Sequence, residues 1–228
     1  MSKGIETFAE VLQDPEYLYE GDLDAYFRVI TEAPNLHNGY HDLRHMLHVT
    51  YVCYKGLEFY RDKRQPVDAG EARNLLIAAL FHDYDHTGTI GPDFRNIERA
   101  ILGLRKNILN EDKLALDAIS GIIRATQFPH DKLDKDTPIT HRLIRDADLS
   151  QGLSDAWIGS TLEGLASEQR RSVTEMLEES INFFRGLHFE TEFGEEVYGS
   201  RVSLRINEAE YLLRVLKVDN SQPRPSNS

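Results

Sequence analysis

Several features that would narrow the function of a protein are missing from these 228 residues. Cys53 is the single cysteine, which excludes an internal disulfide and any zinc site built from several cysteines. No apolar run approaches the roughly 18–20 residues that a membrane-spanning helix needs. The first residues, MSKGIETFAEVLQDPEY, have neither the basic start nor the apolar stretch of a secretory signal. We therefore expect a cytoplasmic protein that does not bind membranes.

Positive charge is also scarce. The chain has 26 lysines and arginines against 38 aspartates and glutamates, a net charge of −12 at pH 7. The overall field of such a chain repels polyanions, so we expect no nucleic-acid polymer as a partner. A small anionic substrate would need a local positive centre, and a bound metal ion is the usual one.

Apolar residues recur at helical spacing almost throughout the sequence, and strict two-residue alternation is nearly absent. We therefore predict an all-α protein with one domain over residues 1–218 and a disordered tail over 219–228. Loops are expected at 87–93 and 131–137, which are rich in glycine or charge. The predicted helices cover residues 8–12, 23–30, 41–60, 68–82, 97–108, 114–123, 138–147, 173–184 and 202–216.

The nine histidines are clustered together with aspartates. Imidazole nitrogens and carboxylate oxygens are the ligands that suit zinc, iron and manganese, and carboxylates with water suit magnesium. A helix over 41–60 would place His41 and His45 on one face, four residues apart. The clusters are His37, His41, His45 and His48, then His82, Asp83, Asp85 and His86, and finally His130, His141, Asp146 and Asp148.

The adjacent pair His82–Asp83 carries the strongest signal. It follows ARNLLIAALF, an apolar run that predicts a buried helix, and Thr87–Gly88 then breaks the helical pattern. Burying an imidazole and a carboxylate costs several kcal/mol unless they are paired or bind a metal. The context therefore predicts a functional site at this pair.

Four segments resemble a known family, in the family's order. LIAALFHDYDHTG resembles the central motif of the HD superfamily of metal-dependent phosphohydrolases. YHDLRHMLHV resembles the Tyr-His-Asn-x-x-His segment of class I cyclic nucleotide phosphodiesterases, and HDYDHTG resembles their HD-x-x-H-P-G. IRATQFPH is similar to a shortened A-T-D-x-x-x-H segment, and RDADLSQGL is similar to A-D-L-S-N-P. The resemblance covers about residues 38–153, the motif core. The chain equally resembles short bacterial HD proteins that share YHxLxH and a later Asn-x-Glu, here Asn96–Glu98.

The chain departs from the cyclic nucleotide enzymes at several points. Its 83–148 stretch is much shorter, Asp42 replaces their Asn, and Thr87 replaces their Pro. After Leu165 we identify no counterpart of their purine-clamping Gln and Phe. The identity of the substrate is therefore left open.

The resemblance implies two divalent metal ions, whether zinc, manganese, magnesium or iron. It implies Asp83 as the bridge between the two ions and His41 as the general acid. His86 is expected to hydrogen-bond the phosphate or a metal-bound water. Helical periodicity does not separate Asp146 from Asp148, and the resemblance selects Asp148. The implied ligands of the first ion are His45, His82, Asp83 and Asp148, and the residues expected to bind substrate or support these ligands are Tyr40, Asn96, Glu98 and His130.

The expected function is metal-dependent hydrolysis of a small, nucleotide-like phosphate ester, with a phosphodiester preferred because His41 is present. A nucleotide phosphomonoesterase or pyrophosphatase of the HD type is the first alternative. An HD di-iron oxygenase would need more histidine ligands, for which His130 and His141 are the candidates. A silent nucleotide-binding module is the non-enzymatic alternative. The sequence leaves the metal, the substrate and the oligomeric state open.

Overall fold

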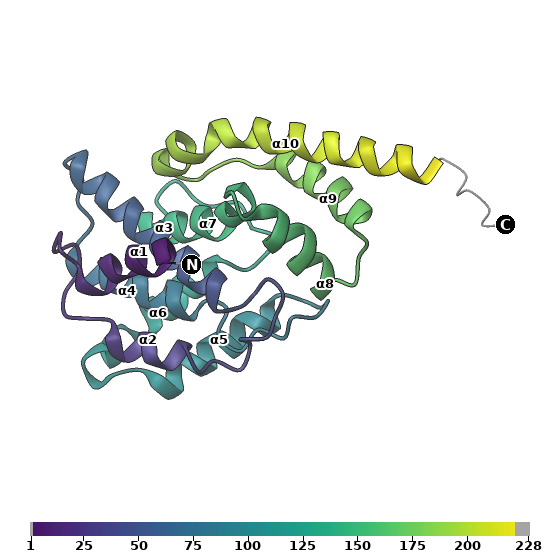
Figure 1. The fold of residues 1–228 in the computed structure, drawn as a ribbon. Coiled ribbons are helices and arrows are strands. Elements are labelled where there is room, and N and C mark those ends of the chain that lie inside the picture. Colours follow the sequence, from purple (N-terminus) through teal and green to yellow (C-terminus); the bar gives the residue numbers. More distant parts are fainter. Residues whose placement is uncertain (1, 222–228) are drawn as a thin grey trace.

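The computed structural model describes the backbone of residues 2–221 and the side chains of residues 8–217 (Figure 1). Over this range the chain is all-helical, with no strand, as predicted. The two predicted loops are both outside helices. The α-helices are α1 (Ser2–Gln13), α2 (Asp24–Ile30), α3 (Leu43–Asp62), α4 (Ala69–Phe81), α5 (Phe94–Asn107), α6 (Leu116–Ala125), α7 (Ile139–Leu149), α8 (Ala166–Glu168), α9 (Val173–Gly186) and α10 (Glu192–Ser221), joined by the 3-10 helices η1 (Asn110–Ala115) and η2 (Ser150–Leu153) and the π-helix η3 (Ile158–Leu165).

Helix α4 forms the centre of the main core. It contacts α2, α3, α5, α6 and α7, and every residue from 75 to 81 is buried. A helix that is apolar on all sides is the type that proteins bury completely. Its end at Phe81 leads directly into His82 and Asp83, which are 1% and 8% exposed. The apolar run thus carries this pair into the interior, as the sequence predicts.

The start of α3 differs from the prediction. Asp42 is the N-cap, and its carboxylate accepts hydrogen bonds from the backbone N–H groups of Arg44 and His45. A carboxylate in this position satisfies the free donors of the first turn and fixes where the helix begins. His41 therefore lies just before the helix, and the expectation that it shares a helical face with His45 is wrong.

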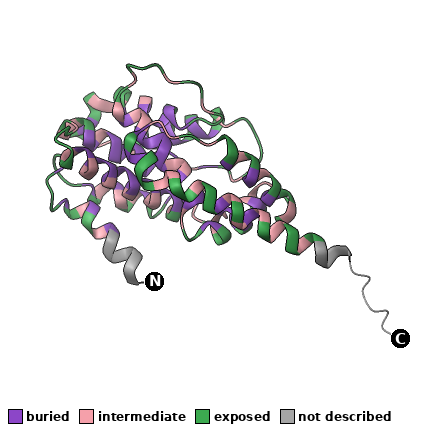
Figure 2. Cartoon of the chain, turned by 90° about the horizontal axis from the view of Figure 1, so that it is seen from above, coloured by how far each residue is buried: buried purple, intermediate pink, exposed green. Residues whose placement is uncertain are grey.

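A second, smaller core joins η3, α9 and α10. It contains Trp157, Leu162, Met176, Leu177 and Ala209. Helix α10 lies along α9, and its far end extends past the body of the molecule (Figure 1). Buried residues concentrate in the body and become sparse along this far end (Figure 2).

The predicted helix over 202–216 is only the middle of α10. Residues 219–221, which we expected in a disordered tail, continue the helix, and 222–228 lie outside the described residues. No helix in the described part of the chain is both long enough and apolar enough to cross a bilayer.

Candidate metal centre

His45, His82 and Asp83 bring ligand atoms within 4.8 Å of one another, and Asp148 contacts both histidines. His45 comes from α3, His82 and Asp83 from the turn after α4, and Asp148 from the last turn of α7. His45 Nε2 lies 2.9 Å from Asp148 Oδ1 and 3.4 Å from Asp83 Oδ2. His82 Nε2 lies 3.4 Å from Asp83 Oδ2 and 3.6 Å from Asp148 Oδ1. The structure thus brings together all four residues that the resemblance implies as ligands.

The spacing between the two histidine nitrogens and the two carboxylate oxygens fits a divalent metal ion. Metal–ligand bonds of about 2.1 Å separate neighbouring ligand atoms by about 3.0 Å in an octahedron and about 3.4 Å in a tetrahedron. The observed separations fall close to this range. His82 Nε2 and Asp83 Oδ2 are also buried without a hydrogen-bond partner, which is unusual for polar atoms in a folded interior. A shared cation would satisfy both atoms.

Both imidazole rings direct Nε2 toward the carboxylates of the cluster. The Nδ1–H of His45 donates to Gln151 Oε1, and the Nδ1–H of His82 donates to the backbone carbonyl of Ala79 at 2.7 Å. Because both partners are acceptors, each Nδ1 carries the proton, and each Nε2 is left with a lone pair when the ring is neutral. Hydrogen bonds of this kind fix the tautomer and orientation of metal-binding histidines.

The electrostatics of the cluster couple metal binding to protons. Burial opposes charge on His82, but Asp83 and Asp148 together raise its pKa well above the usual range. Burial likewise opposes charge on Asp83, but His82 and His41 hold its pKa well below the usual range. A metal ion that binds at Nε2 of His82 must therefore displace a proton from it.

Asp146 and Asp148 point to different partners. Asp146 accepts hydrogen bonds from the backbone N–H of Glu190 at 2.8 Å, the backbone N–H of Thr191 at 2.9 Å and the hydroxyl of Thr191 at 2.6 Å. All three donors lie in the segment that leads into α10. Asp146 is therefore engaged away from the cluster, and Asp148 is the aspartate of α7 that joins it.

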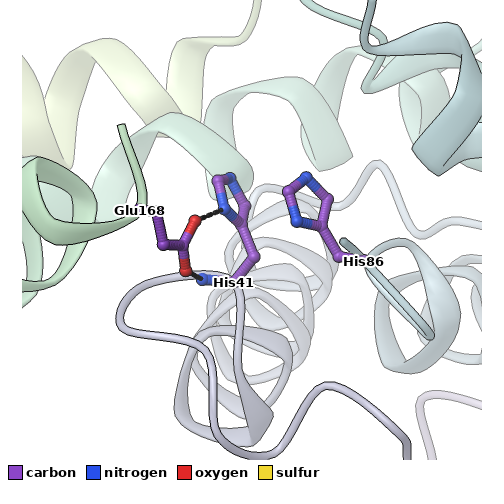
Figure 3. A group of neighbouring side chains, drawn as sticks. All are labelled: His41, His86 and Glu168. Atoms are coloured by element: carbon purple, nitrogen blue, oxygen red, sulfur yellow. Dashed lines mark hydrogen bonds and ion pairs between the residues drawn. The ribbon is translucent and has the colours of Figure 1, made fainter. Parts of the chain in front are cut away.

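His41 forms a hydrogen-bonded pair with Glu168, beside the cluster (Figure 3). Its Nδ1 lies 2.6 Å from Glu168 Oε2, and Glu168 Oε1 accepts from the backbone N–H groups of Tyr40 at 2.6 Å and of His41 at 2.9 Å. Burial opposes charge on His41, but Asp83 and Glu168 raise its pKa above the ordinary 6.5. The pair therefore favours an imidazolium with its Nδ1–H on the glutamate.

His86 stacks on His41, with ring centroids 3.8 Å apart and planes 24° from parallel (Figure 3). The backbone N–H of Gly88 donates to its Nδ1 at 3.0 Å, so the neutral ring carries its proton on Nε2, which lies 2.8 Å from the side-chain amide of Asn96. Burial lowers the pKa of His86 to about 4, so the ring is neutral. The structure thus leaves no free nitrogen for the hydrogen bond to phosphate or water that the resemblance implies, and His86 instead supports the ring of His41.

The ligand atoms of His41, His86 and Glu168 also lie within 4.8 Å of one another. Three carboxylate and imidazole groups at this spacing are sometimes a metal site. Here the hydrogen bond between His41 and Glu168 and the contacts of both His86 nitrogens already account for the cluster. We therefore assign no metal ion to it.

The remaining predicted residues have different surroundings. Tyr40 packs against the rings of His41 and His45, with centroids 4.9 and 4.8 Å away. Asn96 holds His86, as described above. The expected role of Glu98 in orienting a histidine is wrong, because its side chain is 60% exposed and pairs with Arg124 at 3.4 Å. Glu98 follows Asn96 by two residues, and its side chain lies on the exposed face of α5.

His130 and His141 do not join the four-residue cluster. His130 follows a cis Phe128–Pro129 bond, and its Nε2 is buried without a protein partner. His141 lies in the first turn of α7, where its Nδ1 contacts the Thr140 hydroxyl. Among the described residues, the groups whose ligand atoms lie within 4.8 Å of one another are His45, His82 and Asp83, and His41, His86 and Glu168, and neither group includes His130 or His141.

A cavity of about 900 Å³ opens beside the cluster. Tyr40, His41, His86, Asp148 and Glu168 line its polar end. The volume lies in the range of small-molecule sites, which are mostly apolar with a few convergent polar groups. The other walls are largely apolar and aromatic, and they include Phe94, Gln127, Phe128, Leu165, Gln169, Met176, Phe183 and Phe184.

Sequence reasoning missed the residues that hold the site together. Gln151 orients His45, and Glu168 binds His41. Two asparagines before α3 also connect the loop of His41 to the turn after α4. Asn35 Nδ2 donates to the carbonyls of His41 at 2.7 Å and Asp83 at 2.9 Å, and Asn38 Nδ2 donates to those of His41 at 3.2 Å and His86 at 2.9 Å. No local pattern marks any of these residues.

Searches of protein-family models and of curated proteins found no match to this chain. The functional argument therefore rests on the geometry of the site and on the motif resemblance described above.

Proposed function

We propose that this chain is an HD-type metal-dependent phosphohydrolase that cleaves a small phosphodiester. The observation that carries the proposal is the juxtaposition of two groups at the end of one cavity. The first is the convergent set His45, His82, Asp83 and Asp148, and the second is the His41–Glu168 pair. An electrophilic centre and a protonated imidazole side by side are what hydrolysis of an ester with a poor leaving group requires.

His45, His82, Asp83 and Asp148 would hold a divalent ion, which would supply a Lewis acid for the phosphoryl oxygens and a water of lowered pKa as the nucleophile. The resemblance implies a second ion as well. His41 donates its Nε2 proton to the leaving alkoxide. Glu168 keeps the Nδ1–H in place and stabilises the imidazolium before the transfer. His86 and Tyr40 limit the rotation of the ring, and the apolar walls bind the leaving group and exclude bulk water.

The charges in the cavity favour a substrate with one phosphoryl group. Arg171 is the one arginine or lysine among the lining residues that the structure describes, and it is bound to Glu179. Asp93, Glu168 and Glu179 add negative charge to the walls. A nucleoside triphosphate would face these carboxylates with its outer phosphates, whereas a phosphodiester has a single charge, which the metal ion neutralises. The aromatic walls suit a flat ring such as a nucleobase.

The general acid also favours diesterase over the other candidates. An HD phosphomonoesterase or pyrophosphatase needs the four ligands but not the His41–Glu168 pair. A di-iron oxygenase needs further histidine ligands, and His130 and His141 lie outside the cluster. A nucleotide-binding module without catalytic activity would not explain why His82 Nε2 and Asp83 Oδ2 are buried without hydrogen-bond partners.

The test is a turnover screen with purified protein stripped of metal and then loaded with Mn²⁺, Mg²⁺, Zn²⁺ or Fe²⁺. The substrates are cyclic mononucleotides, cyclic dinucleotides, nucleoside mono- and triphosphates and bis(p-nitrophenyl) phosphate. We expect metal-dependent hydrolysis of a cyclic mononucleotide and of the nitrophenyl diester, and no turnover of triphosphates. The Asp83→Ala variant is the control and should be inactive on every substrate. Oxygen consumption by the iron form, or no turnover with any metal, would reject the proposal.

A further inference from the structure

Two glycines from distant parts of the chain meet backbone to backbone beside the cavity. Gly39 lies in the loop that leads to His41, and Gly164 lies in the π-helix η3. A Cβ atom on Gly39 would lie 2.6 Å from the carbonyl oxygen of Gly164, and a Cβ atom on Gly164 would approach the carbonyl oxygen of Gly39 even more closely. Ordinary contact begins near 3.4 Å, so neither position has room for a side chain. The two backbones approach to a distance that only glycine permits.

This contact is adjacent to the hydrogen bonds that hold His41. One turn after Gly164 the chain reaches Glu168, and directly after Gly39 it reaches Tyr40 and His41. Glu168 accepts all three of its hydrogen bonds from those two residues. The distance between the loop and η3 at the glycines therefore sets the distance between Glu168 and His41.

Gly159 shows that this close approach is specific to Gly164. It lies in the same π-helix, about one turn earlier, and a Cβ atom there would meet nothing within 4 Å. π-Helices are rare, appear mostly as single-turn bulges inside α-helices and are frequently found at functional sites. Of the two glycines in η3, only Gly164 meets another backbone segment so closely that no side chain fits.

We propose that Gly164 is a positioning residue for the general acid, acting through its backbone contact with Gly39. The inference rests on the proposed function for its catalytic consequence, but the placement of Glu168 on His41 is testable without any activity. In Gly164→Ala the added methyl group meets backbone atoms of Gly39, which cannot rotate away as a side chain would. The loop and η3 would have to separate by about 1 Å, and Glu168 would lose its bonds to His41.

The experiment compares Gly164→Ala with Gly159→Ala and Glu168→Gln in the full-length protein. The first measurement is the proton NMR signal of His41 Nδ1–H, identified by its loss in His41→Gln. The second is turnover of a ribose phosphodiester against a nitrophenyl diester, with metal content measured in parallel. Misplacement of a catalytic group by about 1 Å can cost about 10²-fold in rate. Gly39→Ala, with a milder clash, serves as the second variant if Gly164→Ala does not fold.

We expect Gly164→Ala to lose the Nδ1–H signal and to lose about 10²-fold on the ribose ester only, with full metal content. Adding Glu168→Gln should cause little further loss, and Gly159→Ala should behave as wild type. An unchanged NMR signal in Gly164→Ala, or equal losses on both substrates, would overturn the inference. If the wild type hydrolyses no phosphate ester, the proposed function fails, and the NMR comparison still decides the inference.

Discussion

Glu168 and His41 are 127 positions apart in the sequence, and their side chains share a hydrogen bond of 2.6 Å. The same carboxylate also accepts hydrogen bonds from the backbone N–H groups of Tyr40 and His41. Glu168 therefore fixes the place of the histidine, its tautomer and its charge. The pair with Glu168 distinguishes His41, for which we propose proton donation, from His45, for which we propose metal binding, although both lie in one histidine-rich segment.

Replacement of His41 by alanine should slow hydrolysis of a ribose phosphodiester by about 10²–10⁴-fold without removing metal, because a general acid is lost. The nitrophenyl diester should be largely spared, since nitrophenolate leaves as a stable anion. Steady-state rates on the two esters, with metal content by mass spectrometry, test this. His45→Ala is the matched control and should damage both reactions. Equal losses on both esters in His41→Ala would assign His41 a structural or ligand role.

The two aspartates of α7 should respond in opposite ways. Asp148→Asn should lose metal and activity, because it removes a carboxylate ligand. Asp146→Asn should keep most of its metal but lose about 1–3 kcal/mol of folding stability, because the hydrogen bonds from Glu190 and Thr191 are weakened. Metal analysis and urea denaturation separate the two effects. Loss of metal in Asp146→Asn, with retention in Asp148→Asn, would reverse the assignment.

His48 should make the stability depend on pH. Ser150 donates its hydroxyl proton to the Ala147 carbonyl at 2.6 Å, so its oxygen accepts from His48 Nε2–H at 2.8 Å. Burial lowers the pKa of His48 from 6.5 to about 4. The unfolded chain therefore takes up this proton first as the pH falls. The contribution of His48 to stability is complete above pH 6.5 and decreases toward pH 4, by about 3 kcal/mol at most.

The measurement is the free energy of unfolding of wild type and His48→Gln between pH 7.5 and pH 4.5. Glutamine retains a donor for Ser150 but has no titrating group. The stability of the wild type relative to this variant should therefore decrease as the pH falls. A difference that stays constant over the range would contradict the assignment of a buried neutral His48.

Gly56→Ala should destabilise the protein although alanine favours helices. The methyl group would lie 2.5 Å from Leu143 Cδ1, in the buried contact between α3 and α7. Overpacking costs about 1–3 kcal/mol and the helix gain is about 1 kcal/mol, so we expect a net loss of up to about 2 kcal/mol. Because α3 and α7 carry His45 and Asp148, metal affinity should fall as well. Gly186→Ala, at the open end of α9, is the control for denaturation and metal titration.

The sequence predicts those parts of the fold whose signals are local. Helix α4 was identified by its continuous apolar run, and the ligand motifs by residues that lie close together in the chain. The start of α3 was missed because Asp42 acts as a cap through its own carboxylate. The π-helix η3 was missed because its residue spacing does not follow the α-helical period.

The supporting residues of the site could not be found in the same way. Gln151 and Glu168 are ordinary polar residues in their own segments, and they gain a role only when folding brings them to His45 and His41. The positions of hydrogen-bond partners more than 100 residues away are set by tertiary packing. His86 shows the converse, because its motif position implied a free imidazole that Gly88 and Asn96 occupy in the folded chain.

The hydrogen bonds that Asp146 accepts from the segment before α10 affect which fragments of this protein can keep the site. Asp146 and Asp148 are two positions apart at the end of α7, one anchored to Glu190 and Thr191 and the other aimed at the ligand cluster. A fragment limited to the motif core, residues 38–153, would contain every ligand but would lack the partners of Asp146. It would also lack Glu168. The C-terminal third of the chain therefore contributes to the proposed catalytic site, and the boundaries of the motif are not the boundaries of the unit that a functional fragment would need.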